Sequence, residues 1–148
     1  MAAFDDLRDL AAWRLAHQMT VRVDIFLHCP DFRRHYTLCD RLADAARAGP
    51  RYIADGHASR NHLGFAQLVR KAAASEAEVL DHLIDAHAQK LITSDELTIN
   101  EQLVRRALNE AAGLIRQLEA ATRAGGPART RRSLSANGAG GSPATLRS

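Results

Sequence analysis

The sequence predicts an all-α fold, an antiparallel up-down-up-down four-helix bundle with a disordered C-terminal tail. Hydrophobic residues make up 46% of the 148 residues and aromatic residues only 5%. Alanine and leucine outnumber alternating Val/Ile/Thr runs, which favours helices over strands. Apolar residues recur at helical spacing in four segments joined by short connections, the pattern of an up-down bundle. The length suits one domain, so we assign residues 1–122 to the bundle and 123–148 to the tail.

The first helix is expected from Asp5 to Leu27. Aspartates in its first turns suit the positive end of a helix, and Cys29-Pro30-Asp31 stops it. Its apolar stripe consists of Ala12, Ala16, Met19, Val23 and Phe26.

The second helix is expected from Arg34 to Asp55, with a bend at Gly49-Pro50. Proline has no backbone N–H and clashes with the preceding turn, at a cost of about 3 kcal/mol or more inside a helix. Gly56 is expected to supply a left-handed C-cap. The inward positions are Leu38, Leu42, Ala45, Ala46 and Ile53.

The third helix is expected from Leu63 to Leu91, after a polar connection at residues 57–62 in which Ser59 or Asn61 provides the N-cap. Its broad apolar face indicates contact with more than one neighbour. One side carries Phe65, Val69, Ala72, Val79, Leu83 and Ala86, and the positions that widen it are Leu68, Leu80, Ile84 and Leu91.

The fourth helix begins with a capping box in which Thr93 and Glu96 satisfy each other's backbone N–H groups. Its seam alternates steps of four and three through Val104, Leu108, Ala111, Ile115 and Leu118. After Thr122 the chain is rich in Gly, Ala, Ser, Pro and Arg, with too few large apolar residues to offset the entropy of folding. We therefore expect residues 123–148 to be disordered.

The net charge of +3 comes from the tail. Five arginines follow Thr122 with no acidic residue among them, so residues 1–122 carry a net charge of −2. Cys29 and Cys39 show no CxxC pattern and are read as free thiols in core packing. The N-terminus is acidic, and no apolar run approaches the roughly 18 residues of a membrane span. These features predict a cytoplasmic protein without membrane association.

Four short sequence motifs occur in order along the chain. The first two are Phe4-Asp5-Asp6-Leu7 with Ala12-Trp13, and the Pro-containing loop at Cys29-Pro30. The third phrase is Pro50-Arg51-Tyr52-Ile53-Ala54-Asp55-Gly56. These phrases resemble the four helix bundle family named after proteins encoded in intervening sequences of bacterial 23S ribosomal RNA genes. The family's third phrase is Pro-x-Asn-Ile-Ala-Glu-Gly, so Tyr52 and Asp55 stand in place of Asn and Glu.

The fourth phrase, on the third helix, is Phe followed by Ala-x-Gly-Ser-x-x-Glu, with Ala74 in place of glycine. The positions matched to the family's structural motifs are Trp13, Pro50, Ile53, Asp55, Gly56, Ser75 and Glu78.

This family is similar to the accessory variability protein of diversity-generating retroelements. The resemblance implies a bundle that assembles into a barrel-shaped homopentamer and binds RNA or DNA together with a reverse transcriptase. A scaffolding oligomer that binds only another protein, such as a reverse transcriptase, is the alternative.

Catalytic and metal sites find little support in the sequence. Glu78, His82 and Asp85 share a helix face, but no Glu-x-x-His motif of the kind used by bundle di-metal sites occurs. Neither nucleotide-binding nor hydrolase motifs occur. Trp13, Ile53 and Phe65 occupy core registers and are expected to pack. We therefore predict a protein that is not an enzyme and has no cofactor.

Nucleic-acid contact is suggested by arginines on and near the second helix, although Asp40 and Asp44 among them leave a salt-bridged solvent face as the alternative. Repetition around a ring would concentrate the charge, and the tail arginines would add to it. The candidate residues are Arg47, Arg51, Arg60, Arg70 and Lys71, with Arg129, Arg131 and Arg132 in the tail.

Overall fold

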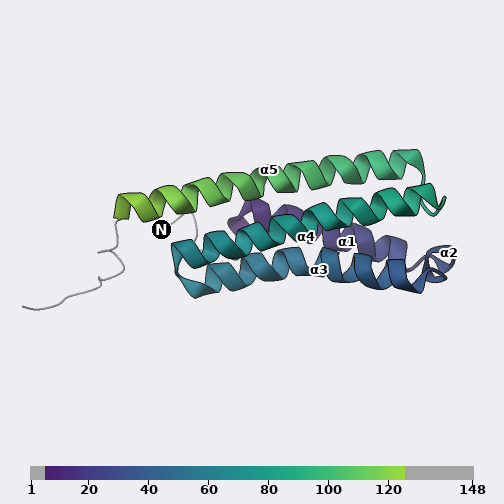
Figure 1. The fold of residues 1–148 in the computed structure, drawn as a ribbon, viewed down its shortest axis with the longest axis horizontal. Coiled ribbons are helices and arrows are strands. Elements are labelled where there is room, and N and C mark those ends of the chain that lie inside the picture. The colour runs from purple at the N-terminus through teal and green to yellow at the C-terminus, as the bar shows by residue number, and fades with distance from the viewer. Residues whose placement is uncertain (1–5, 126–148) are drawn as a thin grey trace, which may run out of the picture.

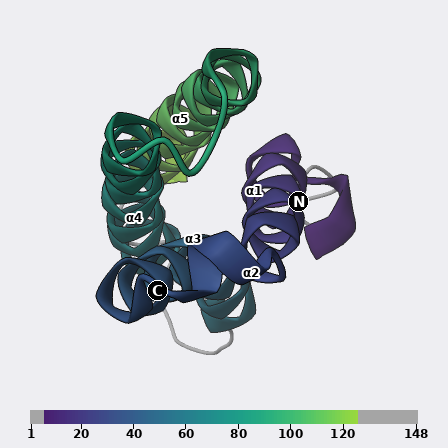
Figure 2. The same ribbon diagram turned by 90° about the vertical axis from the view of Figure 1, so that its right-hand side faces the viewer.

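The computed structural model describes residues 6–125, which form helices and no strands (Figure 1). Four long helices pack against each other. Helix α3 lies against α1 and α4, while α5 lies against α4 and α1, so each long helix has two principal neighbours (Figure 2). The elements are η2 (Leu7–Asp9), α1 (Ala11–Leu27), α2 (Pro30–Arg33), α3 (Tyr36–Ser59), α4 (His62–Ala88) and α5 (Ser94–Gly125).

Several expected helix ends were wrong. The first α-helix begins at Ala11, because Asp6 instead caps a separate 3₁₀ turn by accepting a hydrogen bond from the N–H of Arg8. Pro30 opens the short helix α2, where its missing N–H costs nothing. At the other end of the chain, α5 continues past the expected boundary to Gly125. The remainder of the expected tail, residues 126–148, lies outside the described residues.

Both N-caps expected from the sequence are confirmed. Asn61 caps α4, with its side-chain oxygen accepting from the N–H of Gly64 at 2.9 Å. Before α5, the N–H of Thr93 donates to Glu96 Oε1 at 2.8 Å, and the N–H of Glu96 donates to Thr93 Oγ1 at 3.0 Å. These local bonds fix where α4 and α5 begin.

The apolar stripes expected for the first three helices are buried, and they form two hydrophobic clusters along the bundle. Three positions differ clearly from expectation. Ile84 is 49% exposed rather than part of the core. On α5 the seam is rotated, so that Leu108 and Ile115 are only partly buried. The fully covered positions of α5 are Leu103, Val104, Ala107, Ala111, Leu114 and Leu118.

Helix α3 continues through Gly49 and Pro50 without ending. Because Pro50 has no N–H, the carbonyl of Ala46 lacks the donor that residue 50 would otherwise supply. Thr20 of α1 replaces it, since its hydroxyl donates to the Ala46 oxygen at 2.6 Å. The neighbouring helix therefore repairs the hydrogen bond that the proline removes.

Gly56 does not end α3, which was the expectation from the sequence. It lies inside the helix, and the left-handed C-cap is Arg60, with φ 55° and ψ 25°. Gly56 instead allows α4 to approach, because a Cβ there would lie 2.4 Å from Phe65 Cδ1 and 3.2 Å from Phe65 Cα. Helix α3 consequently runs on to Ser59 and needs only Arg60 and Asn61 to reach α4.

No helix within residues 6–125 combines the length and the apolar character needed to cross a membrane.

Replacing Thr20 by valine is expected to lower the free energy of unfolding by about 1–3 kcal/mol, because the Ala46 carbonyl loses its donor. In a Pro50→Ala background the loss should be clearly smaller, since residue 50 then donates to that carbonyl. Urea unfolding of the two single variants and the double variant measures this coupling. Thr122→Val is the matched control, because Thr122 bonds the Leu118 carbonyl within its own helix. Equal losses from Thr20→Val in both backgrounds would contradict the repair.

Gly56→Ala is expected to destabilise the protein by about 1–3 kcal/mol, because the added methyl group overlaps Phe65. Gly113→Ala is the control within α5, where the nearest atom to an added Cβ is Arg116 Nη2 at 3.7 Å. That substitution should raise stability by about 0.5–1 kcal/mol, as alanine favours a helix interior. Thermal unfolding distinguishes the two, and stabilisation by Gly56→Ala would refute the packing role.

Candidate functional site

The predicted cations within the described residues lie on the α3–α4 pair, and all of them are exposed. Arg47 and Arg51 are one turn apart on α3, Arg60 caps that helix, and Arg70 and Lys71 are adjacent on α4. The tail candidates Arg129, Arg131 and Arg132 lie outside the described residues.

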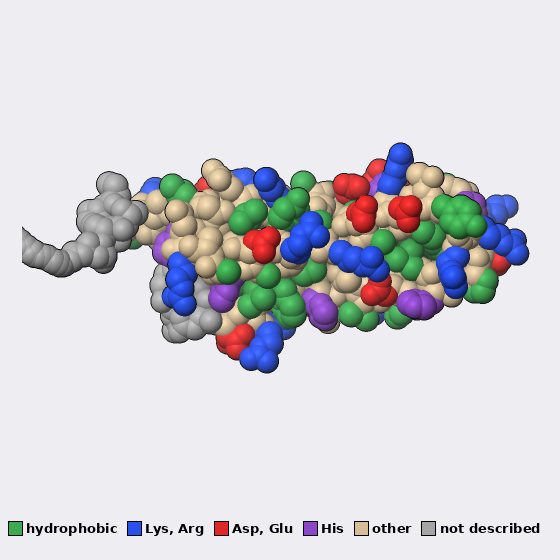
Figure 3. Space-filling model, turned by 90° about the horizontal axis from the view of Figure 1, so that it is seen from below, with side chains coloured by type: hydrophobic (Ala, Val, Ile, Leu, Met, Phe, Trp, Pro, Cys, Tyr) green, Lys and Arg blue, Asp and Glu red, His purple; other side chains and the backbone are tan. Residues whose placement is uncertain are grey.

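These cations do not gather into one patch. Arg47 pairs with Asp24 of α1 at 3.4 Å, whereas Arg70 pairs with Glu119 of α5, so the two arginines lie on opposite flanks of the α3–α4 pair. In Figure 3 the Lys and Arg side chains are spread along the face, with acidic and hydrophobic side chains between them. One subunit therefore presents separated positive charges rather than a continuous basic surface.

The ion pairs of these arginines are weak restraints. The side chains of Arg47 and Asp24 are 57% and 44% exposed, and an exposed pair of this kind contributes about 0–1 kcal/mol. The guanidinium of Arg51 lies 5.5 Å from the centre of the Tyr52 ring. A phosphate group is thus able to compete for Arg47 and Arg51 at little cost.

The positions matched to the family motifs have different environments. Ile53 is buried, Pro50 is partly buried inside α3, and Asp55 is exposed. Ser75 is partly buried, while Glu78 is exposed and within 3.1 Å of His82 Nε2. They do not form one cluster.

Trp13 is only partly covered by the core, unlike Ile53 and Phe65. Its ring stacks on that of His17, with centroids 4.9 Å apart and planes 7° from parallel. This aromatic pair was not recognised in the sequence. The spacing of four residues on a helix was the signal that predicts such a contact.

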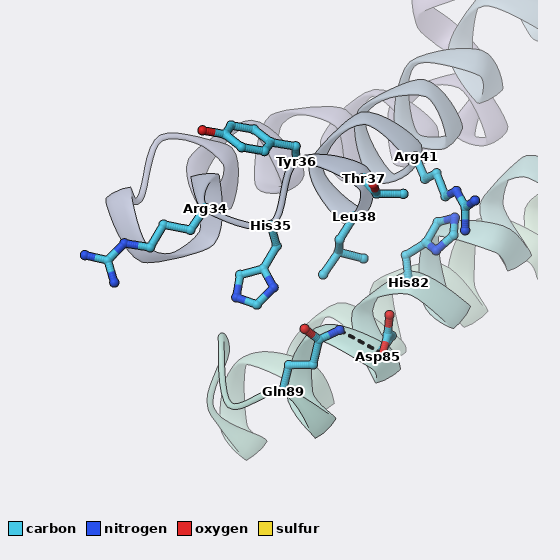
Figure 4. Close-up of a pocket in the computed structure, with 9 residues that line it drawn as sticks. All are labelled: Arg34, His35, Tyr36, Thr37, Leu38, Arg41, His82, Asp85 and Gln89. Atoms are coloured by element: carbon cyan, nitrogen blue, oxygen red, sulfur yellow. Dashed lines mark hydrogen bonds between the residues drawn. The ribbon is translucent and has the colours of Figure 1, made fainter.

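A groove of about 430 Å³ lies where α3 begins and α4 ends (Figure 4). His35 points into it, and the guanidinium of Arg41 lies beside the His82 ring, whereas Arg34 and Tyr36 point away. Asp85 on its floor accepts a hydrogen bond from Gln89 Nε2 at 3.1 Å. The groove is lined by Arg34, His35, Tyr36, Thr37, Leu38, Arg41, His82, Asp85 and Gln89.

The possible metal ligands on α4 have other partners. Glu78 approaches His82, and Asp85 bonds Gln89. Across residues 6–125, no three His, Cys, Asp or Glu side chains are grouped so that they could hold a metal ion.

The two cysteines are free thiols in different settings. Cys29 is exposed, so its expected place in the core was wrong. Cys39 is partly buried, its Sγ donates to the Phe32 carbonyl at 3.1 Å, and burial raises the pKa of this thiol. A raised pKa makes Cys39 a poorer nucleophile at neutral pH.

The most unusual group in the core is Glu76 of α4, which is 1% exposed. Neither of its carboxyl oxygens has a hydrogen-bond partner among the described residues. It faces the small residues of the adjacent helices, and a Cβ placed on Gly49 would be 3.4 Å from Glu76 Oε2 and 3.6 Å from Ala16 Cβ. Burial raises the pKa of Glu76 to about 8, so the carboxyl group is mainly protonated at neutral pH.

Glu76 was missed in the sequence, although the pattern contains a signal. The buried stripe of α4 runs through Val69, Ala72, Val79 and Leu83, and Glu76 occupies the position that this stripe skips. The resemblance to the intervening-sequence family instead drew attention to Ser75 and Glu78. A charged residue at a position that helical spacing places in the core is the signal by which Glu76 could have been found.

The stability of the protein is expected to fall as the pH rises from about 4.5 to about 8. In this range the unfolded chain has already lost the Glu76 proton that the folded chain retains, so the slope approaches about −1.4 kcal/mol per pH unit. Glu76→Gln should remove this slope and exceed the wild type in stability at pH 8. Urea unfolding at several pH values tests it, with Glu110→Gln at an exposed position of α5 as the control. A slope that persists in Glu76→Gln would assign it to other groups.

Comparison with known proteins adds no family to these observations: no protein-family model matches the chain, and no curated protein matches it.

Proposed function

We propose that this protein is a non-enzymatic accessory factor that binds RNA or DNA through exposed arginine and lysine side chains on its helices. The observation that carries the proposal is that all five described candidate cations are exposed on the α3–α4 pair. Within residues 6–125, none of the three side chains Arg51, Arg60 and Lys71 forms an ion pair with an acidic side chain. Their charges are therefore available to phosphates, whose contacts supply most non-specific affinity.

The proposal includes an up-down-up-down topology and assembly into a ring, a pentamer by resemblance to the intervening-sequence family. Because a single subunit has separated charges, a ring that repeats them would raise the local potential. The tail arginines Arg129, Arg131 and Arg132 would add further positive charge for binding phosphates. The two free thiols support a cytoplasmic location.

A protein-binding scaffold, for example one for a reverse transcriptase, is the second candidate. Exposed apolar side chains favour it, since Val21 and Ile25 are 48% and 61% exposed one turn apart on α1. Partner binding through such side chains should depend little on salt.

The triple variant Arg51→Gln, Arg60→Gln, Lys71→Gln is expected to weaken binding of a labelled oligonucleotide and to flatten its salt dependence. Each phosphate contact that is lost should lower the slope of log K against log salt concentration by about 1. The charge-matched control is Arg105→Gln, Arg106→Gln, Arg116→Gln on α5. Fluorescence anisotropy at several salt concentrations measures both.

Light scattering coupled to size exclusion, with absorbance at 260 and 280 nm, gives the subunit number and any bound nucleic acid in the same experiment. Equal losses in the two triple variants would point to general charge attraction. A monomer that binds no oligonucleotide at low salt would refute both the ring and the nucleic-acid role.

A further inference from the structure

The seam between α1 and α3 presents an aromatic pair beside positive charge. Trp13 is partly buried against the second core cluster, and His17, stacked on it at 4.9 Å, is exposed. The core therefore holds the tryptophan in place, while the imidazole ring extends the stack toward solvent.

The register of the two helices places this pair near the arginines of α3. Ala16 lies opposite Gly49, and Thr20 donates to the Ala46 carbonyl. Trp13, His17, Thr20 and Asp24 follow one another at spacings of four, three and four, so they share the flank of α1 that faces α3.

The ion pair between Asp24 and Arg47 confirms that Arg47 reaches this flank. Arg51 is one turn further along α3, toward the end of the seam where Trp13 lies. Both side chains are exposed, at a spacing of four residues. Arg47 is held only by its ion pair with Asp24, and the guanidinium of Arg51 lies 5.5 Å from the centre of the Tyr52 ring. Aromatic rings next to a row of cations are the combination that binds single strands, where bases stack and phosphates meet positive charge.

We propose that the α1–α3 seam binds single-stranded nucleic acid, with an unpaired base stacking on His17 and adjacent phosphates contacting Arg47 and Arg51. This inference rests on the proposed function and narrows it to strands with unpaired bases. In a duplex the bases are stacked inside the double helix, so their faces do not reach a side chain on a helix surface. Stacking is tolerant of sequence because every base has an aromatic face.

The chain contains a single tryptophan, which makes Trp13 a direct reporter of the seam. We expect its fluorescence to be quenched by oligothymidylate and oligouridylate of about twelve nucleotides, and much less by a duplex of equal length. His17→Ala should weaken single-strand binding about tenfold or more, measured by anisotropy of a labelled oligonucleotide. The matched control is Gln18→Ala, which removes an exposed side chain next to His17 on the flank of α1 that faces α5.

The experiment separates this inference from the proposed function. If oligonucleotides bind without quenching Trp13 and His17→Ala binds as the wild type does, stacking at the seam is wrong while the proposed function stands. Equal affinity and equal quenching by the duplex would likewise overturn the inference. Absence of binding by any oligonucleotide at low salt would overturn both.

Circular dichroism tests whether the His17→Ala variant is still folded. His17→Ala should retain the helix content and unfolding temperature of the wild type and of Gln18→Ala, so that weaker binding reflects the loss of the ring rather than a loss of fold. Oligouridylate and oligodeoxyuridylate differ only in the sugar, so if both quench Trp13, the one that binds more tightly identifies RNA or DNA as the preferred ligand of the seam.

Discussion

The contact on which the bundle depends is the one between Thr20 and the carbonyl of Ala46. A proline inside a long helix leaves a carbonyl without its donor, and a buried carbonyl without a partner costs free energy. Here α1 supplies the missing donor, so the defect in α3 becomes a specific link between two helices. The same link sets the register of α1 against α3, and the register then decides which side chains share the seam.

Small residues continue this pattern on the other side of α3. Gly56 leaves room for Phe65, and Gly49 leaves room for Glu76, so α4 approaches α3 closely at two levels. The carboxyl group of Glu76 lies at the junction of the two core clusters with no hydrogen-bond partner among the described residues. Such a group is expensive to bury and remains buried chiefly as the neutral acid. The free energy of unfolding is therefore expected to depend on pH through this carboxyl group.

The packing of the core decides which side chains are exposed along α1 and α3. Partial burial of Trp13 leaves His17 stacked on it and exposed, while Arg47 is held only by a weak surface ion pair with Asp24. A stable core thus presents aromatic and positive groups without using them for its own stability. This division suits the binding role proposed above, because an extended strand contacts separated groups along a surface.

Helical periodicity alone determined the four long helices and most of their buried positions, since apolar residues spaced three and four apart mark the face of a helix that is covered. Local hydrogen bonds also made the caps at Asn61 and Thr93 predictable, because these bonds depend on neighbours in the chain. Tertiary structure decided the rest. Glycine is typical of helix C-caps, yet Gly56 lies inside α3 and allows Phe65 of α4 to pack closely against it. Glu76 resembles a surface residue, yet its register places it in the core. The partner of the Ala46 carbonyl comes from a helix 26 residues earlier in the chain, and contacts of that kind depend on how whole helices pack.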